Sequence, residues 1–164
     1  MTKEKDTPIK NSDELSADSL RDQVIGRMSL FILLILLLVA GLSYQTNMFG
    51  FPAFLDAEGT NIANAWAVIE QGTMTPYTYA YEESPLSNYL FAAWFLATDG
   101  FETFGFPVSS GRVLMFIFHM LSVALVFLIT RRLSNNDLAA IIATLIFALS
   151  PLALSIQRRV LTAN

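Results

Sequence analysis

The chain has 164 residues, of which 54% are hydrophobic, and its mean hydropathy of +0.50 is too high for an ordinary soluble domain of this size. It has no cysteine and a single histidine, which excludes a disulfide framework, a thiolate metal site and a multi-histidine metal cluster within one chain. The net charge of −4 comes from charges segregated by segment, and no segment is basic enough to bind nucleic acid. Because the apolar residues also occur in blocks, the composition predicts a membrane protein.

The N-terminal residues 1–27 are mostly polar and cannot bury enough apolar surface to fold alone. We therefore predict a disordered cytoplasmic tail, with the stretch 16–22 as a candidate short helix at the membrane surface. The apolar run at 28–44 then predicts a first transmembrane helix, since about 20 residues cross the hydrocarbon core and only a helix satisfies its own backbone there. Tyr44, at the end of this run, is expected at the membrane–water interface.

Two more apolar runs, about 113–130 and 138–156, predict the second and third transmembrane helices. The link between them, RRLSNND, is so short that the two helices must form an antiparallel hairpin. Pro151 removes one helical hydrogen bond and predicts a kink near the end of the third helix. The predicted fold is thus an all-α polytopic membrane protein with residues 28–164 in its transmembrane domain.

The loop at 45–112 contains two further helical patterns. Residues 59–71 place Ile62, Ala65, Trp66 and Ile69 on one stripe, with Thr60, Asn61, Asn64 and Gln71 largely elsewhere. Gly72 is a predicted helix stop. Residues 85–98 begin with proline and are apolar but short for a full span, which favours a helix in the interface or packed in protein.

The basic residues predict the orientation. Arg21 and Arg27 precede the first span, Arg131 and Arg132 follow the second, and the loop between these spans carries acidic residues and no Lys or Arg before Arg112. By the positive-inside rule the N-terminus is cytoplasmic and the loop at 45–112 is extracytoplasmic, in a multi-pass protein of the cell membrane.

Arg158 and Arg159, after the third span, then fall on the outer side against the positive-inside bias. We expect them to pair with the acidic loop or with a phosphate group; the alternative is a solvated interfacial pair.

Asp56 and Glu58 lie between the first span and the first loop helix. Carboxylates there are stabilised by the helix dipole, so Asp56 is a candidate helix cap. Alternatively, the two carboxylates face one site, where they accept a proton from a hydroxyl nucleophile or help to hold a divalent cation. No dedicated metal site or other cofactor is predicted.

The order of these features resembles the N-terminal part of the GT-C membrane glycosyltransferases, most closely the protein-mannosyltransferase and aminoarabinose-transferase-like branch. The motifs that carry the resemblance are D-A-E-G-T at 56–60, A-W-A-V at 65–68 with Gly72, P-Y-T-Y-A-Y-E-E-S-P-L at 76–86, G-R-V at 111–113, R-R-L at 131–133, I-F-A-L-S-P-L-A-L at 146–154 and R-R-V-L-T-A-N at 158–164. The resemblance covers residues 28–164.

The resemblance implies transfer of a sugar from a polyprenyl-phosphate donor, held in the bilayer, to an unidentified acceptor on the outer membrane face. It implies that Asp56 or Glu58 acts as the catalytic base or orients the acceptor. It also implies substrate-binding roles for the residues of the tyrosine-rich segment and of the arginine pair, namely Tyr79, Tyr81, Glu83, Arg158 and Arg159.

This chain departs from the family pattern at several positions, the first being D-A-E-G-T, in which one residue separates the two acids. Relatives carry a basic residue near Glu83 and Ser84, and an aspartate where this chain has Ala163. Family enzymes also continue through many more spans, so we expect a fragment of a longer enzyme, an interrupted gene or a remnant. The alternative function is a non-catalytic membrane protein that binds a lipid or a partner.

His119, within the second span, suggests a third interpretation. Ionisable groups inside the membrane are often functional, so the residue is a candidate proton relay in a channel or transporter. The alternative is a hydrogen bond to a neighbouring helix, and no broken-helix repeat supports transport.

Overall fold

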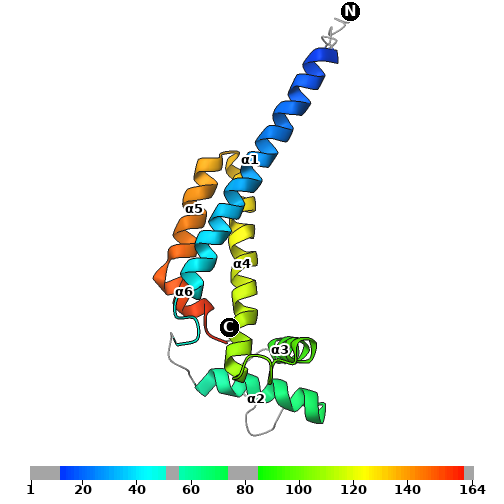
Figure 1. The fold of residues 1–164 in the computed structure, drawn as a ribbon, viewed down its shortest axis with the longest axis vertical. Coiled ribbons are helices and arrows are strands. Elements are labelled where there is room, and N and C mark those ends of the chain that lie inside the picture. The colour runs from blue at the N-terminus through cyan, green and yellow to red at the C-terminus, as the bar shows by residue number, and fades with distance from the viewer. Residues whose placement is uncertain (1–11, 51–55, 74–84, 161–164) are drawn as a thin grey trace, which may run out of the picture.

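The computed structural model describes residues 12–50, 56–73 and 85–160, and within these ranges every regular element is a helix. The elements are α1 (Ser12–Gln45), α2 (Asp56–Gln71), α3 (Pro85–Thr98), α4 (Pro107–Ser134), α5 (Asp137–Leu149) and α6 (Pro151–Gln157). Figure 1 shows α1, α4 and α5 running side by side, with α2 and α3 across the end of the bundle at which α4 begins. The predicted all-α membrane fold is confirmed.

The first helix is longer than expected. α1 begins at Ser12, so residues 12–27 are helical where a disordered tail was predicted. The reason is cooperativity: the apolar part of α1 supplies the helical nucleus, and each further residue then adds one hydrogen bond at little cost. Residues 1–11 lie outside the described part of the chain.

Two described helices are long and apolar enough to cross a membrane. They are Arg27–Gln45, with a mean hydropathy of 2.2, and Pro107–Ser134, with 2.6. α5 and α6 make a third span if they are taken together, and they meet at a bend of 59°. Pro151 opens α6, and the side chain of Ser150 accepts a hydrogen bond from the Ala153 amide at 3.4 Å. The predicted kink is therefore present, and its free backbone amide is capped.

Alanine side chains of α1 and α5 lie at the buried contacts among α1, α4 and α5. Ala40 of α1, Val123 of α4 and Ala148 of α5 form one buried cluster, and Leu36, Phe127 and Ala140 form another. In a bilayer such close packing is what drives helix association, because lipid is as apolar as the side chains. The outward faces expose large apolar residues such as Phe31, Leu34 and Leu38, as a lipid-facing surface requires.

The predicted hairpin between the second and third spans is confirmed. α4 ends at Asn135, which has a left-handed backbone (φ 49°) and whose amide donates to the Arg131 carbonyl. The Asn136 side chain caps α5 by accepting from the Leu138 amide at 2.9 Å. α4 and α5 then pack against each other along their length.

Both loop helices are present, and α2 and α3 pack on each other and on α4. Gly72 (φ +71°) ends α2 as predicted, with its amide bound to the Val68 carbonyl. Ile62 and Ala65 enter the shared core as expected, but Trp66 remains 45% exposed. The prediction that the polar residues of α2 lie away from its buried face is partly wrong, because Asn61 is fully buried and Asn64 is nearly fully buried.

Candidate functional site

Glu58 lies in the first turn of α2, and its side chain is buried. Arg112, near the start of α4, donates from Nε to Glu58 Oε1 at 3.2 Å and from Nη2 to Glu58 Oε2 at 3.0 Å. Both side chains are almost completely removed from solvent. This two-pronged arrangement is the strongest geometry available to an arginine and a carboxylate.

The remaining amino group of Arg112 reaches the chain just after α1. Its Nη1 donates to the carbonyls of Met48 at 3.1 Å and Phe49 at 3.3 Å. Burying a guanidinium is costly unless its charge and its donors are satisfied, and here Glu58 and two carbonyls satisfy them. Arg112 thereby connects the exit of α1 with the entry of α2.

The segment after α6 is held at the same place. The Val160 amide donates to Glu58 Oε1 at 2.9 Å, and the Val160 carbonyl accepts from Asn61 Nδ2 at 2.9 Å. Gly111 permits this contact, because a Cβ added there would lie 2.8 Å from Val160 Cγ2. We call Glu58, Asn61, Arg112 and Val160 the Glu58 cluster; it joins α2, α4 and the chain after α6.

Arg158 lies beside this cluster and is only 6% exposed. Its Nη2 donates to the Ser43 carbonyl at 2.6 Å, and its guanidinium lies 5.4 Å from the centre of the Tyr44 ring. Its Nε has no partner among the described residues. Burial lowers the pKa of the guanidinium, which the nearby Tyr44 side chain partly opposes.

Tyr44 itself differs from expectation. Its side chain is fully buried between helices instead of facing an interface, and its hydroxyl donates to the Gln157 carbonyl at 2.9 Å. A tyrosine can bury its ring among helices when its hydroxyl finds such a partner.

Arg159 is half-buried, and its Nε has no partner among the described residues. Within the described part of the chain no carboxylate forms an ion pair with Arg158 or Arg159. Among the described carboxylates of the acidic loop, Glu58 pairs with an arginine, and its partner is Arg112.

His119 forms a hydrogen bond to a neighbouring helix, which was one of the two roles considered for it from the sequence. Its Nδ1 is hydrogen-bonded to Gln157 Oε1, and its ring lies against Tyr44 and Phe147. The residue thus joins α4 to α6 inside the bundle.

The other predicted site residues are only partly placed. Asp56 is the first residue of α2, and its side chain lies outside what the structure describes. Tyr79, Tyr81 and Glu83 also lie outside the described residues. Among the residues that are described, no three histidine or acidic side chains are grouped closely enough to hold a metal ion.

A comparison with protein families identifies the family of the chain. The dolichyl-phosphate-mannose-protein mannosyltransferase family matches residues 28–163, which is most of the chain. The chain belongs to this family. No curated protein and no solved structure gives a significant match. Membership makes the chain part of a group of membrane glycosyltransferases of the mannosyltransferase type, and it confirms the resemblance found in the sequence.

Arg112 is the residue of the Glu58 cluster whose role was not predicted from the sequence. It was noted only as the middle of the G-R-V motif that opens the second span. A usable signal was present, because an arginine beside an apolar span needs an anionic partner, and the acidic loop supplies several.

Proposed function

We propose that this mannosyltransferase-family protein transfers a sugar from a polyprenyl-phosphate donor to a hydroxyl acceptor at the outer membrane face. The observation that carries the proposal is the Glu58 cluster, which gathers the start of α2, the opening of α4 and the chain after α6 at one end of the bundle. The family motifs D-A-E-G-T, G-R-V and R-R-V thereby meet in one region.

The two acidic residues take different roles in this proposal. Both oxygens of Glu58 are bound by Arg112, and one of them also accepts from Val160, so Glu58 is a positioning residue. Asp56, two residues earlier at the N-terminus of the same helix, is then the candidate base. Its carboxylate accepts the proton of the acceptor hydroxyl as the oxygen attacks the anomeric carbon.

The leaving group also needs a partner. As the bond between the anomeric carbon and the phosphate oxygen breaks, the polyprenyl phosphate gains negative charge, which a guanidinium can stabilise. Arg159 is the better candidate for this role, because Arg158 is already bound to Ser43 and Tyr44. Tyr79, Tyr81 and Glu83 complete the proposed substrate site in the loop.

Transfer of labelled mannose from dolichyl-phosphate mannose, measured in membranes that contain the protein, tests the catalytic proposal. Asp56→Asn should reduce transfer by at least about 100-fold, the scale of general-base catalysis, while lowering the free energy of unfolding by no more than about 1 kcal/mol, the loss of one charge at a helix N-terminus. Glu70→Asn, an exposed acidic residue at the other end of α2, is the control and should leave transfer unchanged. Full activity of Asp56→Asn would show that Asp56 is not the catalytic base. A wild-type protein that binds the donor but never transfers the sugar would support the non-catalytic alternative.

The proposed topology places the N-terminus and the α4–α5 turn in the cytoplasm and the loop at 45–112 outside. Because the chain has no cysteine, single cysteines at Glu102 and Ser134 can be labelled without background. Both positions are exposed. In intact cells an impermeant maleimide should label the first and not the second, and the opposite pattern would invert the topology.

A further inference from the structure

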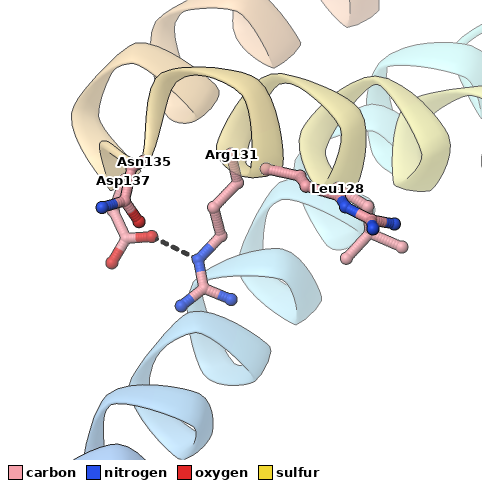
Figure 2. A pocket seen from close by; sticks show the side chains of 5 residues that line it. Leu128, Arg131, Asn135 and Asp137 are labelled. Atoms are coloured by element: carbon pink, nitrogen blue, oxygen red, sulfur yellow. Dashed lines mark hydrogen bonds and ion pairs between the residues drawn. The ribbon is translucent and has the colours of Figure 1, made fainter.

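We propose that the α4–α5 turn binds the phosphate headgroup of an anionic phospholipid. A cavity of about 730 Å³ opens there, lined by Leu128, Arg131, Arg132, Asn135 and Asp137. We call it the turn pocket, and Figure 2 shows its side chains. It lies at the opposite end of α4 from Arg112, so it is separate from the Glu58 cluster.

The single acidic side chain of the pocket is already neutralised. Asp137 accepts from Arg131 Nε at 2.6 Å, the contact drawn in Figure 2, and from the Ser29 hydroxyl at 3.4 Å. This pairing also fixes Arg131 through its Nε. Its two terminal amino groups make no hydrogen bond with other described residues.

Arg132 supplies the uncompensated charge. It is exposed, and its guanidinium has no partner in the described part of the chain. With Arg131 and Asp137 cancelling each other, the pocket carries one net positive charge beside the terminal amino groups of Arg131 and the amide of Asn135. Arginine donors of this kind bind phosphate oxygens in pairs.

The apolar side of the pocket points to a lipid rather than a soluble phosphate. Leu128 lies one turn before Arg132 on the same side of α4 and is 49% exposed. Leu125 and Leu121, which are 56% and 55% exposed, continue this side along the membrane-crossing part of the helix. A phosphate at Arg132 would therefore place its acyl chains along these leucines, as in other basic lipid sites at membrane surfaces.

Native mass spectrometry of the full chain in a neutral detergent tests the site, with phosphatidylglycerol and phosphatidylcholine as probes. Phosphatidylglycerol should bind more tightly, and Arg132→Gln should weaken it by about tenfold, the loss of one charge-assisted contact. Arg27→Gln removes the same charge from an exposed position at the same end of the bundle but outside the pocket, and should change affinity less than about twofold. Equal effects of the two variants, or no effect of Arg132→Gln, would overturn the proposal.

Two further variants distinguish the contribution of the lipid headgroup to binding from that of the acyl chains. Asn135→Asp keeps a residue that tolerates the left-handed backbone but adds a negative charge. It should weaken the binding of phosphatidylglycerol as strongly as Arg132→Gln does. Leu128→Gln leaves the charges intact and should also weaken lipid binding. An unchanged affinity would overturn the proposal that the acyl chains lie along the leucines of α4. Inorganic phosphate and glycerol phosphate should fail to displace the lipid at equal concentration. Displacement by either would reassign the pocket to a soluble phosphate compound.

Discussion

Replacing Glu58 with glutamine removes the negative charge of the Glu58 cluster but keeps the size of the side chain and one carbonyl oxygen. Arg112 would then be a fully buried guanidinium that has lost the carboxylate bound to its Nε and Nη2, while its Nη1 keeps the carbonyls of Met48 and Phe49. The Val160 amide would keep an acceptor in the glutamine oxygen. The substitution therefore tests the charge of the pair rather than the shape of the site.

The magnitude follows from the burial of both partners. Removing one partner of a buried ion pair costs about 3–5 kcal/mol, and we expect Glu58→Gln to lie near the lower end, at about 3 kcal/mol, because its oxygen still serves Val160. Glu58→Ala should cost about 1–3 kcal/mol more, since it also leaves the Val160 amide without an acceptor. Glu70→Gln, an exposed control on the same helix, should stay within about 0.5 kcal/mol of the unchanged protein.

The assay is equilibrium unfolding in mixed micelles, followed by helical circular dichroism. A double-mutant cycle with Arg112→Met should show that the two substitutions together cost about 2 kcal/mol less than the sum of the single ones, because the double variant leaves no buried charge unpaired. If Glu58→Gln costs no more than Glu70→Gln, or if the cycle is additive, the pair does not stabilise the fold. Glu58 would then regain its place as a candidate base.

The same unfolding assay checks three other features: the packing of Gly111 on Val160, the backbone at Gly59 and Gly72, and the hydrogen bond between Tyr44 and Gln157. Gly111→Ala should lower the free energy of unfolding by about 1–3 kcal/mol, because its Cβ would lie 2.8 Å from the Val160 side chain. Adding Val160→Ala to this variant should recover part of that loss. Full stability of Gly111→Ala would contradict the close contact. Gly59→Ala should stabilise α2 by about 0.5–1 kcal/mol, since its Cβ meets nothing within 4 Å, whereas Gly72→Ala should destabilise it by about 1 kcal/mol, since its φ is +71°; the reverse signs would refute this reasoning. Tyr44→Phe should cost about 1 kcal/mol by removing the hydrogen bond to Gln157, and an unchanged free energy would show that this bond contributes nothing.

The Glu58 cluster also changes how the acidic motif is interpreted. In the sequence, Asp56 and Glu58 were both candidates for one catalytic role, with Asp56 slightly favoured. In the structure, Glu58 is bound on both oxygens by groups from two distant segments, so its carboxylate is occupied. Loss of activity in a Glu58 variant would therefore have to be compared with its loss of stability before any chemical role is assigned.

Several elements were predictable from local sequence. The apolar runs became helices because a chain in lipid must satisfy its backbone internally, and this requirement does not depend on tertiary contacts. The bend at Pro151 and the stop at Gly72 were equally local, since one lacks an amide and the other accepts a positive φ. The start of α1 was not predictable, because composition alone does not show how far a helix extends beyond its apolar part.

The direction of individual side chains was less predictable. Tyr44 and Asn61 are polar-tipped residues that the pattern placed at an interface or on a polar face, yet both are buried. Each is buried because a backbone carbonyl lies in reach, that of Gln157 at the end of α6 for Tyr44 and that of Val160 after α6 for Asn61. Trp66 shows the converse, since it follows the apolar stripe but remains half exposed beside Phe106 in an apolar groove.

The sequence by itself therefore determined the helices, the hairpin, the membrane class and the family. Only the tertiary structure decided which residues meet, because Glu58 is 54 residues from Arg112 and 102 from Val160 along the chain. A hydropathy pattern reports the environment of each residue and not its partner. A buried charge requires a partner but does not specify which one, and here that choice was made by the packing of α2 and the Val160 segment against the start of α4.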